Sequence, residues 1–286
     1  MPTFCLLVPA AGSGRRFAAS AKGDLKDDNK LEAELGDRPV FLRALECFNH
    51  RKDVSQTVLA VDPDQIEQFK FKHGARLGFH GVTVVPGGRA ERWETVLNAL
   101  EAVDDDCTHV AVHDAARPIA SAALIDRVFG AAEQHAAIVP GLPVTNTLKR
   151  VAPASSPGDD GSEGRDPVDA ILGSAGRTVI ETRLVMETID RTNLVEVQTP
   201  QVFETALLRR AYEALAAGEL DPSGVTDDAS LVEALGQPVH VVDGDVMNLK
   251  ITRHEDLEMA KALISATKEQ KAAETARKRL FADDED

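Results

Sequence analysis

Apolar runs that alternate with helical patterns through the first half of the chain constrain its fold more than any other feature. Five short apolar runs predict buried strands, at residues 4–8, 57–61, 82–85, 109–113 and 137–139. Helical periodicity lies between them, at residues 40–48, 63–72, 92–103 and 121–134, with Ser121 as the cap of the last helix. This order predicts an α/β fold, with a mostly parallel, twisted sheet and helices on both faces.

The second half of the chain departs from this alternation after Val144. Residues 147–151 predict an extended arm, and residues 152–170, rich in Pro, Gly, Ser and Asp, predict a loop or disordered insertion. Further extended segments are expected at 178–182, 194–198 and 239–242, and helices at 204–217, 229–235 and from Glu255 onward. We expect one domain over residues 1–265, with the arm and insertion at about 145–195, and a charged helical or disordered tail at 266–286. No repeat of fixed period indicates a solenoid or propeller.

The formal net charge of −15 bears on the partners of the chain. A broad acidic surface repels nucleic acid and anionic membranes, so we expect neither as a partner. A nucleotide substrate remains compatible with this charge if basic residues gather locally.

Cysteine usage and the N-terminal segment bear on the compartment. Cys5, Cys47 and Cys107 are far apart and show no zinc spacing, and an odd number without a disulfide framework fits a reducing compartment. No basic segment precedes the apolar run at residues 4–11, so it does not resemble a signal peptide, and no run approaches the length of a membrane span. We expect a cytoplasmic protein.

The first chemical signal is the segment PAAGSGRR that follows the first strand. Small residues let backbone N–H groups approach a ligand, successive N–H groups form an anion site, and arginines donate bidentate bonds to phosphate. The dinucleotide pattern GxGxxG lacks its third glycine, because Phe17 follows Arg16, and the GxxxxGK[ST] loop is absent. The segment predicts a phosphate-binding turn, although a tight strand-to-helix turn with arginines in solvent remains open.

The second signal is the segment VHDAARP, where a buried strand ends in a carboxylate and an arginine. Ligands of open α/β sheets gather at the carboxyl ends of strands. Asp114 there is suited to hold magnesium, directly or through water, or to bind a sugar hydroxyl. Arg117 is suited to bind a phosphate or to pair with Asp114, and His113 is expected to be a packing residue.

Several motifs occur together in a fixed order. They are PAAGSGRR, Pro86-Gly87-Gly88, VHDAARP, TLKR at 147–150, Asp190-Arg191, TPQ at 199–201, TDDAS at 226–230 and NLKIT at 248–252. Over roughly residues 3–265, with insertions, the chain resembles the 2-C-methyl-D-erythritol 4-phosphate cytidylyltransferase family of the non-mevalonate isoprenoid pathway. VHDAARP, and TPQ followed by TDDAS, are the most specific pieces.

The resemblance implies a function, a fold and an assembly. The enzyme would transfer CMP from CTP to 2-C-methyl-D-erythritol 4-phosphate, releasing pyrophosphate and forming 4-diphosphocytidyl-2-C-methyl-D-erythritol. It would have a Rossmann-like nucleotidyltransferase fold with a protruding β-arm and would use Mg²⁺ as cofactor. Because the arm of this family crosses to a neighbouring subunit, the implied assembly is a homodimer with composite active sites.

The resemblance also implies residue roles. Arg16 and Lys30 would be catalytic, and Asp114 would hold the metal. The implied nucleotide-binding residues are Ala10, Ala11, Gly12, Ser13, Gly14, Gly87, Gly88, Thr95 and Asp114. The implied substrate-binding residues are Asp114, Arg117, Thr147, Arg191 and Lys250.

The chain departs from the family pattern at three places. The family usually has Lys-Gln-aromatic where this chain has Lys30-Leu31-Glu32, after a longer, acidic loop, so Lys22 and Lys26 are alternatives to Lys30. An insertion follows the TLKR motif and lengthens the arm. One extra residue between Gly88 and Thr95 leaves open whether Arg89 or Arg92 contacts the nucleotide.

Two other functions are compatible with the motifs. A ribitol-5-phosphate cytidylyltransferase, or another pyrimidine sugar-phosphate nucleotidyltransferase, would share the glycine-arginine turn and the lysine. The Ala115-Ala116 pair and the set Thr147, Arg191 and Lys250 favour methylerythritol phosphate. The other alternative is a non-catalytic nucleotide-binding protein, which would bind CTP without turnover of a sugar phosphate.

Overall fold

The computed structural model describes residues 1–12, 15–20, 30–153 and 182–282 of the chain. The chain forms two compact units: Met1–Leu142 together with Val197–Asp286, and Pro143–Glu196. The expected division between a domain and a tail at residue 265 remains a prediction.

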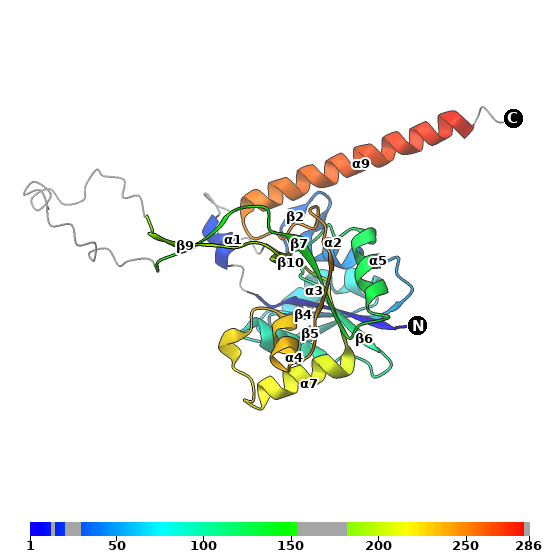
Figure 1. Cartoon of the computed structure of the whole chain (residues 1–286). Helices are drawn as coiled ribbons and strands as arrows, with labels where there is room; N and C mark the ends of the chain where they lie inside the picture. Colours follow the sequence, from blue (N-terminus) through cyan, green and yellow to red (C-terminus); the bar gives the residue numbers. More distant parts are fainter. Residues whose placement is uncertain (13–14, 21–29, 154–181, 283–286) are drawn as a thin grey trace, which may run out of the picture. The chain divides into compact units, whose positions relative to one another are not determined.

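The structure contains an eight-stranded sheet with the order β10-β7-β11-β6-β1-β4-β5, and β12 pairs with β7 (Figure 1). The strands are β1 (Phe4–Ala10), β4 (Val54–Val61), β5 (Val82–Pro86), β6 (His109–Val112), β7 (Ala137–Pro143), β10 (Val195–Val197), β11 (Gln201–Glu204) and β12 (His240–Asp243). Strands β6, β1, β4 and β5 run parallel, and β12 runs parallel to β7. The expected mostly parallel α/β sheet is therefore confirmed.

Helices cover both faces of this sheet, as Figure 1 shows for α4 and α7 on one face and α2 and α5 on the other. They are α1 (Arg15–Ser20), α2 (Val40–Glu46), α3 (Ile66–Phe79), α4 (Arg92–Leu100), α5 (Ala122–Ala131), α7 (Thr205–Ala216), α8 (Asp228–Ala234) and α9 (His254–Ala282). Successive side chains of a strand point to opposite faces. In β1, Phe4, Leu6 and Val8 therefore enter one buried apolar cluster, while Cys5 and Leu7 enter the other.

Strand β11 is the main difference from the sequence-based expectation. It runs antiparallel between β6 and β7, pairing Val202 with Ala111 and with Ile138. The sequence predicts no strand between the extended segment at 194–198 and the helix at 204–217, because a four-residue strand directly after Pro200 shows no period of its own. Its insertion makes the sheet mixed and separates β6 from β7.

Smaller differences occur at element ends. Helix α3 extends to Phe79 rather than residue 72, and a short hairpin of β2 (Glu34–Leu35) and β3 (Arg38–Pro39) was not expected. The expected cap of α5 is confirmed, since the Ser121 hydroxyl oxygen accepts a hydrogen bond from the backbone N–H of Leu124 at 3.2 Å.

The second unit contains the expected arm. Strands β8 (Leu148–Val151) and β9 (Val185–Ile189) form an antiparallel hairpin in which Leu148 pairs with Ile189. Most of the predicted insertion, and all but the last residue of the extended segment expected at 178–182, lie outside the described residues.

Candidate active site

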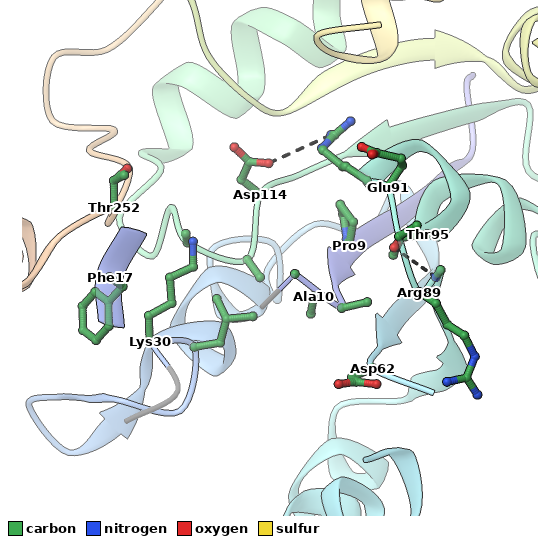
Figure 2. Close-up of a pocket in the computed structure, with 18 of the residues that line it drawn as sticks. Pro9, Ala10, Phe17, Lys30, Asp62, Arg89, Glu91, Thr95, Asp114 and Thr252 are labelled. Carbon is green, nitrogen blue, oxygen red and sulfur yellow. Dashed lines mark hydrogen bonds and ion pairs between the residues drawn. The ribbon is translucent and has the colours of Figure 1, made fainter. Parts of the chain in front are cut away.

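A cavity of about 780 Å³ lies in the first unit, at the carboxyl ends of parallel strands. Its walls come from the end of β1, from the turns after β5 and β6, from the turn at Lys30 and from the segment before α9 (Figure 2). Open α/β sheets bind their ligands at this edge, because the connections after the strands converge there. The cavity therefore brings together motifs that are more than 200 residues apart along the chain, from Pro9 to Thr252.

The turn after β1 supplies one wall through Ala10, Ala11 and Gly12. A Cβ atom built on Gly12 would meet no atom of the described residues beyond its chain neighbours within 4 Å. Ser13 and Gly14 lie outside the described residues, as does the side chain of Arg16. The backbone of Arg16 belongs to α1, directly after the turn.

The turn after β5 needs its two glycines for packing. A Cβ atom on Gly87 would lie 2.7 Å from the Cβ of Ala11, and one on Gly88 would lie 2.8 Å from the backbone nitrogen of Thr95. The backbone N–H of Gly88 donates to Thr95 Oγ1 at 3.1 Å, and the Gly87 carbonyl accepts from Asn98 at 3.0 Å. Thr95 is buried and thus holds the turn against the start of α4.

Asp114 lies directly after β6 and faces three cationic side chains. Its Oδ2 is 2.6 Å from Lys250 Nζ and 3.6 Å from Arg117 Nε, and its Oδ1 is 4.0 Å from Arg92 Nη2. Burial would raise the pKa of the Asp114 carboxyl, but Lys250, Arg92 and Arg117 together hold that pKa well below its usual range. The carboxylate is therefore ionised at neutral pH.

Lys250 is placed beside Asp114 by its neighbour in the chain. Ile251 is fully buried, and its backbone N–H donates to the carbonyl of Ala116 at 2.8 Å. This contact joins the segment before α9 to the turn after β6. The side chains of Lys250 and Thr252 consequently reach the cavity.

Arg117 is buried, and the cavity lining includes Asp114, Ala115 and Ala116 but not Arg117. Its Nη1 donates to the carbonyl of Asn248 at 2.7 Å, and burial lowers the pKa of its guanidinium. This placement matches the alternative of an internal pair with Asp114 better than direct phosphate binding.

His113 is fully buried, as expected of a packing histidine. Its Nε2 lies 3.0 Å from the carbonyl of Arg117, and its Nδ1 lies 3.2 Å from Thr199 Oγ1. Burial lowers the pKa of the imidazole to about 4. The ring is thus neutral at pH 7 and lines no part of the cavity.

Lys30 lines the cavity, and Figure 2 shows its side chain extending toward the side where Asp114 lies. The two residues that follow it are anchored: Leu31 is buried, and Glu32 forms an ion pair with Lys72 of α3. The unusual Lys-Leu-Glu sequence is therefore compatible with a fixed Lys30. Lys22 and Lys26, the alternatives, lie outside the described residues.

Thr147 and Arg191 belong to the second unit, and both are exposed. Arg191 Nη1 donates to the carbonyl of Thr145, which links the end of the arm back to its start. Both residues therefore belong to a different unit from the residues of the cavity.

Arg92 is one of the two arginines that the sequence left open as a nucleotide contact, whereas Asp228 and Thr199 had no predicted role. Arg92 lines the cavity and ion-pairs with the buried Asp228 at 2.7 Å. Thr199 Oγ1 accepts a hydrogen bond from the backbone N–H of Asp114 at 3.0 Å. The TPQ and TDDAS motifs contain Thr199 and Asp228, so the signal was present in the sequence without a role attached to it.

The donor set fits a magnesium ion that is shared with a ligand. Within the ranges that the structure covers, no three His, Cys, Asp or Glu side chains come together as a metal cage. Mg²⁺ commonly takes only one or two carboxylates and completes its shell with substrate phosphates and water. Asp114, with Oδ2 paired to Lys250 and Oδ1 4.0 Å from Arg92, offers one such carboxylate.

A mostly parallel sheet with a glycine-rich turn after β1, and a carboxylate and lysines around a cavity at the carboxyl ends of its strands, defines the chain as a nucleotidyltransferase of Rossmann-like fold. A family model described as 2-C-methyl-D-erythritol 4-phosphate cytidylyltransferase matches residues 4–156 and 172–266. The chain belongs to this family and is a cytidylyltransferase.

Comparison with individual relatives supports the same family. The 2-C-methyl-D-erythritol 4-phosphate cytidylyltransferase of Frankia casuarinae is 36% identical over 92% of this chain and 82% of its own length. That of Rhodopirellula baltica is 35% identical over 91% of this chain and 94% of its own. The crystal structure of the Thermus thermophilus enzyme has a TM-score of 0.63 and 32% identity, covering 91% of this chain and 98% of that one. No helix among the described residues is long and apolar enough to cross a membrane.

Proposed function

We propose that this chain transfers CMP from CTP to 2-C-methyl-D-erythritol 4-phosphate in the cavity of the first unit, releasing pyrophosphate and forming 4-diphosphocytidyl-2-C-methyl-D-erythritol. The observation that carries the proposal is the cluster of Lys250 and Arg92 around Asp114, with Lys30 on the same cavity. A protein of net charge −15 concentrates cations here, where two anionic substrates must meet.

The reaction needs charge neutralisation more than proton transfer. A phosphate monoester has a second pKa of about 6, so the attacking phosphate is mostly a dianion at neutral pH. No general base is required, and the buried His113 supports this view because it does not line the cavity. Catalysis then depends on positioning the two substrates and on stabilising the charge at the α-phosphate and the leaving pyrophosphate.

Each side chain has a proposed role in this scheme. Arg16 and Lys30 stabilise the charge that develops at the α-phosphate, and Lys250 binds the phosphate of the second substrate beside Asp114. The nucleotide lies along the Ala10–Gly12 turn, which Ser13 and Gly14 continue, and against Gly87, Gly88 and Thr95. Asp114 would hold Mg²⁺ together with substrate phosphates, where the ion would neutralise phosphate charge.

We also propose that the arm makes the enzyme a homodimer, with Thr147 and Arg191 of one subunit binding the sugar phosphate at the site of the other. Within the second unit, Leu184, Val185 and Met186 are 72%, 51% and 60% exposed. Exposed apolar side chains that cluster in this way are typical of a surface that another chain covers.

We also propose that the protein is cytoplasmic. All three cysteines are free in the structure, and Cys5 and Cys107 are buried. These unpaired thiols support a cytoplasmic location, where the reducing environment preserves them.

Pyrophosphate release tests the function directly. We expect release from CTP, Mg²⁺ and methylerythritol phosphate, with little from ribitol 5-phosphate under the same conditions. A higher kcat/KM for ribitol 5-phosphate would overturn the substrate assignment. Loss of activity in EDTA, restored by added Mg²⁺, is the expected metal dependence.

Mixing two impaired variants, assayed at a sugar phosphate concentration well below its KM, tests the composite site. In a mixed dimer of Lys30→Ala and Arg191→Ala subunits, one of the two sites would combine an intact Lys30 with an intact Arg191. Random subunit exchange should then raise the activity to about one quarter of the wild-type activity. No rise above the activity of the unmixed variants, with exchange verified by light scattering and mass spectrometry, would show that each chain completes its own site.

A further inference from the structure

The fully buried carboxylate of Asp228 contacts Arg92, a residue that lines the cavity. Asp228, the first residue of α8, has a side chain that is 0% exposed, and its Oδ2 lies 2.7 Å from Arg92 Nη2. Its Oδ1 accepts a hydrogen bond from the buried Tyr212 hydroxyl at 2.5 Å. Burial of a charge is costly unless the charge is paired and hydrogen-bonded, and here Arg92 and Tyr212 provide both.

The position of Asp228 does not depend on Arg92. Gln201 of β11 donates from Nε2 to Asp227 Oδ2 at 2.7 Å and accepts at Oε1 from the backbone N–H of Ala229 at 3.2 Å. Asp227 in turn caps α8 by accepting from the backbone N–H of Ser230 at 3.0 Å. The start of α8 is thus fixed to the sheet through its backbone and through the neighbours of Asp228.

Arg92 lies near two carboxylates, those of Asp228 and Asp114. Both ion pairs that it forms with described residues run through Nη2, one to Asp228 and the other to Asp114 Oδ1 at 4.0 Å. Without the charge of Asp228, the guanidinium would be drawn to Asp114, where it would compete with Lys250. Arg89, the alternative nucleotide contact, instead pairs with Asp64 where both side chains are about two-thirds exposed.

We propose that Asp228, supported by Tyr212, is a positioning residue that holds Arg92 away from Asp114 and directs its guanidinium toward a phosphate oxygen of the bound nucleotide. Arg92 lines the cavity and is 36% exposed, so the rest of its guanidinium is accessible from that side. Guanidinium groups bind phosphate oxygens through charge-assisted, often bidentate hydrogen bonds. The inference rests on the proposed function, because the phosphate is assigned to CTP.

The test compares Asp228→Asn with Glu233→Gln, which also replaces an acid of α8 by its amide. Glu233 is exposed and lies outside the cavity lining, so it has no part in positioning Arg92. Two measurements are made: the affinity for CTP with Mg²⁺ by calorimetry, and kcat with the KM of each substrate. We expect Asp228→Asn to weaken CTP binding and raise the KM for CTP at least about tenfold, with a smaller change for the sugar phosphate, while Glu233→Gln resembles the wild type.

A double-mutant cycle separates positioning from a general structural effect. If Asp228 acts through Arg92, the Asp228→Asn change should add nothing in an Arg92→Ala background. An equally large effect of Asp228→Asn in the Arg92→Ala background, or CTP binding by Asp228→Asn as strong as by Glu233→Gln, would overturn the proposal. A rise confined to the KM of the sugar phosphate would overturn the nucleotide assignment.

Two further measures keep the test decisive. If Asp228→Asn does not fold, Tyr212→Phe removes one hydrogen bond from Asp228, and a loss of CTP affinity that disappears in the Arg92→Ala background is expected. An unchanged affinity in Tyr212→Phe would then count against the proposal. Because calorimetry needs no turnover, a chain that binds CTP but releases no pyrophosphate would contradict the proposed function without deciding this inference.

Discussion

The two compact units hold their charged side chains in contrasting ways. In the first unit, the side chain of Asp228 is fully buried and that of Asp114 is 12% exposed, and each lies against groups that neutralise or hydrogen-bond it. In the second, Arg150 and Glu187 form an ion pair whose side chains are 66% and 54% exposed, and Arg191 is exposed as well. Buried charges keep a geometry before any substrate arrives, whereas exposed ones remain available to another surface and are screened by water.

The largest expected effect concerns the first unit. Lys30→Ala, and likewise Arg16→Ala, should lower turnover at least about 100-fold with the fold intact, because a fixed cation facing the developing charge is lost. Steady-state kinetics and circular dichroism provide the measurement, with Lys70→Ala, an exposed lysine of α3, as the matched control. Near-normal turnover in Lys30→Ala would show that Lys30 is not the catalytic cation and would favour Lys22 or Lys26 instead.

A second effect should appear in the pH dependence of stability. Burial lowers the pKa of His113 from 6.5 to about 4. Between these values the unfolded chain binds a proton that the folded chain does not, so stability is present above pH 6.5 and is lost as the pH falls toward 4. The loss should approach about 3 kcal/mol.

Urea unfolding at several pH values measures this loss. The His113→Asn variant should lack this part of the pH dependence, whatever its stability at pH 7, while His50→Asn, at an exposed position, should retain it. Identical pH profiles for wild type and His113→Asn would contradict the buried, neutral histidine.

A third, smaller effect concerns the arm. Arg191→Ala should raise the KM for the sugar phosphate about tenfold, or roughly 1.4 kcal/mol, and leave the KM for CTP and the stability unchanged. Arg150→Ala, which alters a cation of the same arm that pairs with Glu187, is the control. A change confined to the KM for CTP would show that Arg191 does not bind the sugar phosphate.

The smallest effect should come from the exposed ion pair itself. Glu187→Ala should change the free energy of unfolding by less than about 1 kcal/mol, since exposed pairs contribute little. Chemical denaturation provides the measurement. A loss much larger than this would mean that the arm depends on its charges as the first unit does, and the contrast between the two units would fail.

Local patterns predicted the parts of this protein that local chemistry controls. The strands β1, β4, β5 and β6 followed from apolar runs, and the cap of α5 from Ser121. Strand β11 was missed because its pairing with β6 and β7 depends on distant segments, and four residues after a proline carry no pattern. The choice between Arg89 and Arg92 stayed open for a similar reason, since spacing does not reveal which arginine has a buried partner.

By itself, the sequence determined the α/β class, the residue types that we propose bind phosphate and the family to which the chain belongs. Only the tertiary structure decided which charges meet: Arg92 and Asp228 are 136 residues apart in the chain and 2.7 Å apart in space. The physical reason is that an ion pair depends on distance and burial, which arise only when β11 and α8 pack behind the cavity. A motif such as TDDAS shows which residue types are present, and the fold alone shows that one of its acids holds an arginine in place.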